Sequence, residues 1–179
     1  MWISRRSVLL GVVAVVTLVA CGPSAALKEA RSARYQGTRD EVYLATIEAV
    51  KPLYPVFRSD PEAGTILTDG RWYEPDGTYA DIANANRDTS GSVENLSVDG
   101  AVFLGFIVQV VGAAPPYAVA VLPSAHQVRA GYAAPYKFKP DDPQLPGWVI
   151  GKREKLEVAL HTRLKGQFIT PPGATAPAP

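Results

Sequence analysis

The segment from Ala101 to Val111 constrains the fold of this chain more than any other, because nearly every residue in it is apolar. A turn over Gly112–Pro116 separates it from a second apolar segment, Tyr117–Leu122, which is followed by Pro123. The two segments are predicted to pair as an antiparallel hairpin that ends at the proline. Such continuous apolarity is typical of a strand that is covered on both faces, or on one face by its own chain and on the other by a partner.

Two amphipathic helices are predicted on either side of this hairpin. Residues 39–51 follow a capping box formed by Thr38 and Glu41, and Pro52 ends the regular helix. Residues 148–165 form the second predicted helix, which should end by Gly166. The apolar residues of the second helix recur at helical spacing and are Val149, Leu156, Leu160 and Leu164.

A second hairpin is predicted between the first helix and the apolar segment. Its strands are Tyr54–Arg58 and Thr65–Thr68, joined by the turn residues Asp60–Gly64. The loop 74–99 follows, and a proline-rich loop covers 131–147. This order predicts an α+β fold, in which an antiparallel sheet of about four strands packs against an N-terminal and a C-terminal helix. A single domain is expected over 38–168, and the Pro/Ala-rich residues 169–179 are expected to be a disordered tail.

The first residues resemble a bacterial lipoprotein signal. Arg5 and Arg6 precede the apolar run Val8–Ala20, which is short for a membrane-spanning helix. The run ends in Leu18-Val19-Ala20-Cys21, which matches the lipobox. The resemblance implies that residues 1–20 are cleaved and that Cys21, the only cysteine, carries palmitate-type acyl chains that anchor the protein to a membrane. The alternative is an unmodified cysteine after an ordinary signal peptide.

The residues around the signal also bear on location. Gly22 stands where an aspartate would favour the inner membrane, so the outer membrane facing the periplasm is expected. Ser4–Leu9 resembles a twin-arginine export motif, and the choice between this route and the general secretory route stays open. Residues 21–37 are expected to be a lipidated tether, with one solvated stripe made of Lys28, Arg31 and Arg34.

Composition excludes several classes of function. The formal net charge is +1, which argues against a nucleic-acid partner. One cysteine excludes an internal disulfide framework and a multi-cysteine zinc or iron–sulfur site, and two histidines argue against a histidine-rich metal site. No cofactor is therefore expected, and the expected partners are the membrane and other envelope proteins.

Part of the chain resembles the helix-grip domains of BamC-type accessory lipoproteins of the outer-membrane barrel-assembly machinery. The similar patterns are Val42-Tyr43-x-Ala45, the strand–turn–strand segment Ser59–Thr68, and a C-terminal helix led by Trp148. The resemblance implies a helix-grip fold and a role in envelope assembly. The insertion 74–99 and the single domain depart from that family, and none of the matched residues is catalytic.

Catalytic motifs of the common hydrolases and nucleotide-binding proteins are absent from the sequence. Ser124 and His126 lie two residues apart and would share one face of a strand, but a hydrolase also needs an orienting acid. His161 follows Glu157 by four residues and is expected to join it at a helix surface.

A non-enzymatic, lipid-anchored interaction module is therefore the favoured interpretation. The alternatives are an envelope hydrolase, or a lipoprotein that binds a ligand or partner through aromatic residues in and beside its loops. The aromatic residues considered for such a surface are Trp72, Tyr73, Tyr79, Tyr117, Tyr132 and Tyr136.

Overall fold

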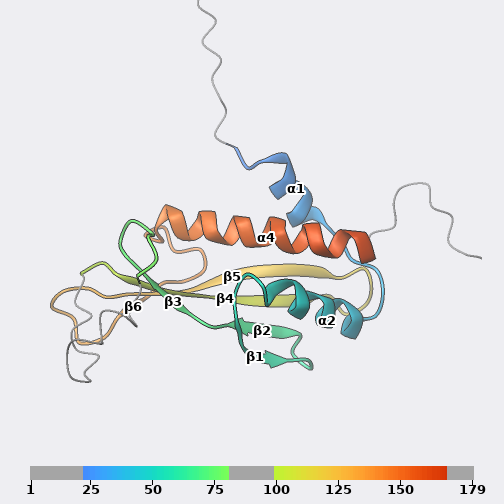
Figure 1. Cartoon of the computed structure of the whole chain (residues 1–179), viewed down its shortest axis with the longest axis horizontal. Coiled ribbons are helices and arrows are strands. Elements are labelled where there is room, and N and C mark those ends of the chain that lie inside the picture. The colour runs from blue at the N-terminus through green and yellow to red at the C-terminus, as the bar shows by residue number, and fades with distance from the viewer. Residues whose placement is uncertain (1–21, 81–98, 169–179) are drawn as a thin grey trace, which may run out of the picture.

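The computed structural model describes residues 22–80 and 99–168, which form an α+β domain with one antiparallel sheet (Figure 1). The predicted signal peptide, Cys21, most of loop 74–99 and the tail 169–179 lie outside the described residues. Within the described ranges, no helix has both the length and the apolar character needed to cross a membrane.

The sheet has six strands in the order β1-β2-β4-β5-β6, and β3 pairs with β4 beside β2. Both predicted hairpins are confirmed, but the expected number of about four strands is too low. The long strand β4 leaves room beyond the short β2, and β3 occupies that room. The strands are β1 (Val56–Asp60), β2 (Thr65–Thr68), β3 (Arg71–Tyr73), β4 (Val102–Val111), β5 (Ala118–Gln127) and β6 (Tyr136–Lys137).

Strand β5 continues through Pro123, where the sequence predicted its end. Proline lacks a backbone N–H, which breaks a ladder only where that N–H would face a paired strand. Pro123 is paired with Phe106 of β4, but the backbone groups of Pro123 point away from β4, to the outer edge. The missing donor therefore costs no hydrogen bond within the sheet.

Three helices accompany the described sheet: α1 (Ala25–Ser32), α2 (Arg39–Val50) and α4 (Gly147–Phe168). The predicted capping box of α2 is confirmed, since the Glu41 N–H donates to Thr38 Oγ1 and the Thr38 N–H donates to the Glu41 carboxylate. Helix α4 runs past its predicted end at Gly166. Its last residue is held by tertiary structure, because the Phe168 carbonyl accepts a hydrogen bond from the Gln36 N–H.

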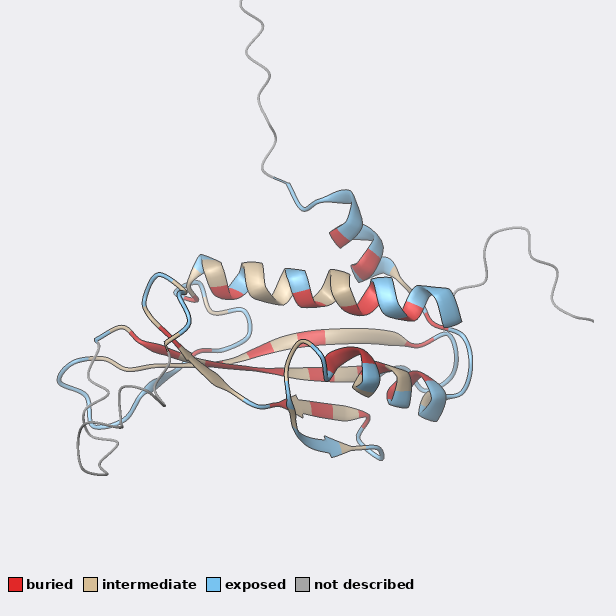
Figure 2. Cartoon of the chain, in the orientation of Figure 1, coloured by how far each residue is buried: buried red, intermediate tan, exposed pale blue. Residues whose placement is uncertain are grey.

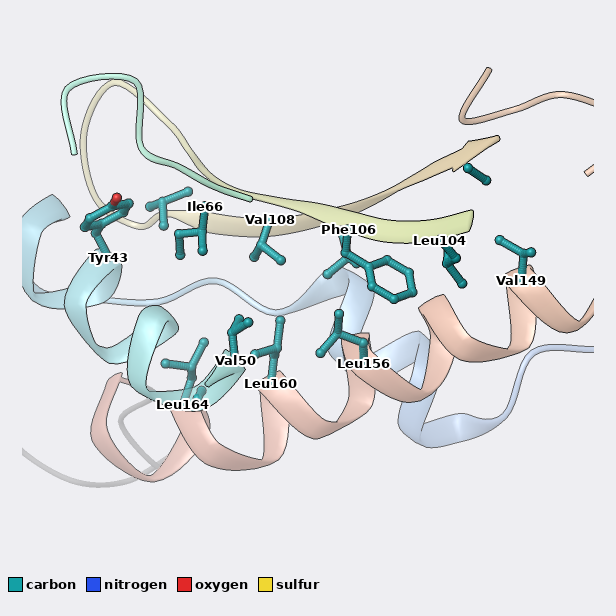
Figure 3. Packing of buried hydrophobic residues seen from close by; sticks show 14 of the residues in the cluster. Tyr43, Val50, Ile66, Leu104, Phe106, Val108, Val149, Leu156, Leu160 and Leu164 are labelled. Atoms are coloured by element: carbon teal, nitrogen blue, oxygen red, sulfur yellow. The ribbon is translucent and has the colours of Figure 1, made fainter. Parts of the chain in front are cut away.

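The core lies between one face of the sheet and helices α2 and α4 (Figures 2 and 3). Alternate residues of β4 point into it, as the two-residue period of a strand requires. Each fully buried aliphatic or aromatic side chain contributes about 1.5–3 kcal/mol relative to an exposed one. The central buried residues include Leu104, Phe106, Val108, Val149, Leu156, Leu160 and Leu164.

The opposite face of the sheet carries the other residues of β4, among them Phe103 and Ile107. Leu67 of β2 and Leu122 of β5 lie beside Ile107 in the register of the strands. All four side chains are partly exposed, and no helix of the described ranges covers them. The continuous apolarity of β4 thus combines one face buried by the chain and one face left accessible.

The expected tether is corrected by the structure, which includes most of it in the domain. Ser24 caps α1 by accepting a hydrogen bond from the Leu27 N–H, and Leu27 is only 2% exposed. Leu27 and Ala30 pack against α4, and Tyr35 is buried in the main core. Only two apolar residues of α1 make this contact, which is too few to give a clear helical period in a charged segment. The folded domain therefore begins near Ser24 rather than at residue 38.

Candidate functional site

The outer edge of β5 is only partly paired. Along its inner edge the whole strand pairs with β4. On its outer edge, Tyr35 exchanges two backbone hydrogen bonds with Tyr117, at N–O distances of 2.8 and 2.9 Å. At the far end, β6 pairs with His126 and Gln127, and the Phe138 N–H donates to the Ala125 carbonyl. Two short segments of the chain thus occupy the two ends of this edge.

Between these ends lies an open stretch of main chain. Backbone groups of alternate strand residues point to the same edge, so Val119, Val121 and Pro123 face outward as Tyr117 and Ala125 do. Within residues 22–80 and 99–168, no backbone group pairs with Val119 or Val121 on this side. The two valines present two N–H donors and two carbonyl acceptors, and Pro123 adds one carbonyl.

This open stretch borders a groove of about 340 Å³. Helix α1 and the segment after it form one wall, α4 forms the second, and β5 forms the third. The groove is lined by Ala30, Arg31, Arg34, Tyr35, the β5 residues from Ala118 to Leu122, Arg153, Glu157 and Leu160.

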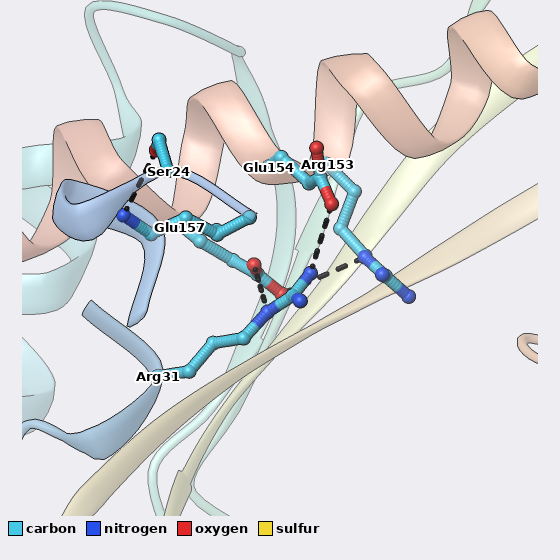
Figure 4. Close-up of polar contacts among 6 residues, drawn as sticks. Ser24, Arg31, Arg153, Glu154 and Glu157 are labelled. Carbon is cyan, nitrogen blue, oxygen red and sulfur yellow. Dashed lines mark hydrogen bonds and ion pairs between the residues drawn. The ribbon is translucent and has the colours of Figure 1, made fainter. Parts of the chain in front are cut away.

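Arginines dominate the charge of the groove, since its lining has three of them and one glutamate. Arg31 Nε donates to Glu157 at 2.9 Å and Arg31 Nη2 donates to Glu154 at 3.3 Å (Figure 4). Arg153 Nε lies 3.5 Å from the second oxygen of Glu157 and makes no hydrogen bond within the described part of the chain. Glu157 is therefore shared between two guanidinium groups.

Arg34 is placed differently from the other two arginines. Its Nη1 donates to the carbonyls of Ser32 and Ala33, at 3.2 and 2.8 Å. Among the residues that the structure describes, no carboxylate forms an ion pair with it. Arg31 and Arg34 are exposed, as the solvated stripe predicted from the sequence requires, and both also line the groove.

His161 holds two walls of the groove together. Its Nδ1 lies 3.1 Å from the Tyr35 hydroxyl and its Nε2 lies 3.1 Å from Glu29 Oε1. A carboxylate only accepts, so Nε2 donates to Glu29, and in the tautomer with no proton on Nδ1 that nitrogen accepts from the Tyr35 hydroxyl. Burial raises the pKa of Tyr35 to about 12, which keeps this donor protonated. The expected surface contact of His161 with Glu157 is wrong, because His161 is 4% exposed and faces α1.

The six aromatic residues considered from the sequence do not form one surface. Tyr73 contacts Tyr79 and Trp148, with ring centroids 6.1 and 5.2 Å apart, and Lys152 Nζ lies 4.3 Å from the centre of the Tyr73 ring. Trp72 packs against Phe103 on the accessible sheet face. These residues all lie at the end of the sheet where β4 begins.

Among the described residues, no ring contact joins the remaining three to that group or to one another. Tyr136 packs against Phe138 and lies under Arg129. Tyr132 is 74% exposed, and Tyr117 is buried at the opposite end of β5. Tyr117 pairs with Tyr35 at one end of the outer β5 edge, and Tyr136 lies on β6 at the other end.

Ser124 and His126 share the accessible face of β5, as expected from their spacing. No carboxylate of the described residues is hydrogen-bonded to either side chain. Ser124 borders a hollow of about 280 Å³ whose other walls are mostly apolar, and His126 does not line it. No group of three or more potential metal ligands gathers in the described ranges.

Comparisons of the chain with protein-family models, with curated protein sequences and with solved structures found no match. The resemblance to barrel-assembly lipoproteins therefore stays a prediction from the sequence.

Proposed function

We propose that this chain is a lipid-anchored protein of the bacterial envelope that acts without catalysis, by binding an extended segment of another envelope protein along β5. The observation that carries the proposal is the open stretch of main chain at Val119 and Val121. An extended peptide can add to such an edge as a further strand, with affinity from main-chain hydrogen bonds and specificity from side-chain pockets.

The two ends of the edge support this mode of binding. Tyr35 and Phe138 already pair with β5 by their backbones, so a segment placed between them would continue an existing row. The stretch from Ala118 to Leu122 is about 17 Å long at 3.3 Å per residue. The binding partner is therefore a short extended segment rather than a long strand.

The sequence at the N-terminus supports the anchor. Only Gly22 and Pro23 separate Cys21 from the helix cap Ser24, which permits a span of at most about 11 Å. Because α1 is a wall of the groove, acyl chains on Cys21 would hold the groove close to the membrane surface. Gly22 favours the outer membrane, with the domain in the periplasm.

The packing of α2 and α4 on one sheet face also supports the helix-grip resemblance and a role in envelope assembly. The enzymatic alternative would need an acid beside His126, and the described residues supply none within hydrogen-bonding distance. A ligand site at Tyr73 and Trp148 would first have to displace Lys152, which lies over both rings.

Site-specific crosslinking in living cells tests the proposal. A benzoylphenylalanine at Ala120, on the groove, should crosslink the full-length protein to an envelope protein, identified by mass spectrometry. A probe at Leu44, exposed on α2, is the matched control. The Val121→Pro variant removes one outward N–H at an edge that already contains Pro123, but it also changes a side chain of the core. Circular dichroism and thermal unfolding therefore accompany the crosslinking, and the variant protein that remains folded should lose the Ala120 adduct.

The possible outcomes separate the parts of the proposal. An Ala120 adduct that survives Val121→Pro, or no adduct at Ala120, would contradict docking at β5. Recovery of a barrel-assembly component would support the resemblance to that family. Recovery of an unrelated envelope protein would support the docking site and contradict the role in barrel assembly that the resemblance implies.

A further inference from the structure

We infer that the segment taken up by the β5 groove is acidic, with carboxylates placed against Arg34 and Arg153. This inference rests on the proposed function and specifies the chemistry of the partner. Its basis is charge complementarity, because three arginines and one glutamate line the groove.

The three arginines are not equally available to a ligand. Arg31 is engaged by both Glu154 and Glu157. Arg34 has only backbone carbonyls as partners among the described residues, and its side chain is exposed. The side chain of Arg153 is 22% exposed, and its one carboxylate contact, to Glu157, is long at 3.5 Å. The structure thus leaves donors on Arg34 and Arg153 for an incoming group.

A ligand strand that covers the groove would make the binding of Arg34 and Arg153 selective for a carboxylate. A strand added to β5 would exclude water from part of Arg34 and Arg153, and a desolvated cation without a partner is costly. A ligand carboxylate would offset that cost and could accept two parallel hydrogen bonds from one guanidinium. A neutral ligand would leave the charges unpaired, and a lysine would add repulsion.

The geometry of a strand also gives the pattern of the ligand. Side chains at alternate positions would face α1 and α4, where the arginines lie, and the others would face the opposite side of the sheet. On that side Ala118, Ala120 and Leu122 are small or apolar and partly exposed. The expected segment therefore alternates acidic residues with small or apolar ones.

Peptide binding to the full chain in detergent micelles tests this inference. The probe is a fluorescein-labelled peptide of about seven residues that alternates threonine and glutamate. Matched peptides carry glutamine or lysine in place of glutamate. Fluorescence anisotropy should show binding of the glutamate peptide, weakened by salt, with at least about tenfold weaker binding of the glutamine peptide and none of the lysine peptide.

Variants locate the effect within the groove. Arg34→Ala and Arg153→Gln should each weaken the glutamate peptide by about tenfold and leave the glutamine peptide unchanged. Arg58→Ala, on β1, is the matched control and should bind like the parent. Arg34 is exposed, so its variant should keep the parent's thermal unfolding even if Arg153→Gln does not.

Each other outcome overturns the inference in a recognisable way. Equal binding of the glutamate and glutamine peptides would be consistent with docking at β5 but would contradict a role for ligand charge. Failure of all three peptides, together with a Val121-dependent crosslink at Ala120, would leave the proposed function and remove the acidic ligand. Binding of Cys21→Ser protein to phosphatidylglycerol vesicles that is lost in Arg34→Ala would assign the arginines to a membrane surface instead.

Discussion

The hydroxyl of Tyr35 lies 3.1 Å from Nδ1 of His161, and this contact joins the end of the β5 edge to helix α4. The backbone of Tyr35 pairs with Tyr117 on β5, so one residue bonds to a strand and to a helix at once. The other ring nitrogen of His161 binds Glu29 of α1. His161 therefore joins the α1 and α4 walls of the groove, and the backbone of Tyr35 connects them to β5.

Removal of the Tyr35 hydroxyl should destabilise the domain. Tyr35→Phe keeps the buried ring but leaves His161 Nδ1 without its donor, at an expected cost of about 1–3 kcal/mol. Thermal unfolding of the full chain, followed by circular dichroism, measures the effect. Tyr132→Phe is the control at an exposed tyrosine and should melt like the parent. A parent-like Tyr35→Phe would show that the buried contact adds nothing to stability.

Acid should loosen the contact of α1 with α4. The hydrogen bond from His161, aided by the nearby Lys165 charge, lowers the pKa of Glu29 below its ordinary value of 4.5. A carboxyl with a lowered pKa stabilises the fold above its unfolded-state value, and this contribution is lost as the pH falls through the folded-state value. Hydrogen exchange in α1 should therefore accelerate below about pH 4.5.

The Glu29→Gln variant is the test of the cause. Its α1 amides should exchange faster than those of the parent at neutral pH, and the acid-dependent increase should be smaller. If the parent and Glu29→Gln respond identically to acid, the carboxylate of Glu29 does not hold α1.

Helix α4 should be docked through Leu160. Leu160→Asp places a charge in the fully buried core and should lower the free energy of unfolding by several kcal/mol, on the order of 3–5. Leu44→Asp puts the same change on a side chain that is 61% exposed and should cost little. Thermal unfolding separates the two, and similar melting of both variants would contradict the packing of α4.

Acylation should depend on one atom, the Cys21 thiol sulfur. Cys21→Ser should abolish incorporation of radiolabelled fatty acid into the full-length protein, because the expected pathway attaches the first lipid to a thiol. The parent, expressed in parallel, is the positive control. Radiolabel that persists in Cys21→Ser would contradict the assignment of Cys21 as the acylated residue.

Much of the fold could be predicted from the sequence, because several of its elements carry strong local patterns. The capping box of Thr38 and Glu41 is a specific local motif, the leucines of α4 repeat at helical spacing, and the apolar run of β4 is long and continuous. Helix α1 was missed because Leu27 and Ala30 alone carry its buried face. The end of β5 was misplaced because the outward orientation of Pro123 depends on which edge β4 occupies.

The groove could not be predicted from the sequence either, because it too depends on how distant segments pair. An open edge is defined by the strands that fail to cover it, and this depends on where Tyr35 and β6 dock. The sequence does present Arg31 and Arg34 at a spacing of three, and Arg153 with Glu157 at a spacing of four. Those spacings are also typical of a solvated helix surface, so only the tertiary fold distinguishes the two interpretations.

Amide hydrogen exchange along β5, measured residue by residue by NMR on the full chain in micelles, tests the open edge most directly. The amides of Val119 and Val121 should exchange rapidly, while those of Ala118, Ala120 and Leu122, which face β4, should exchange slowly. Addition of the glutamate peptide, or of the crosslinked partner once identified, should slow Val119 and Val121 alone. Uniformly slow exchange along β5 in the free protein, or no change at the two valines on binding, would contradict docking at this edge.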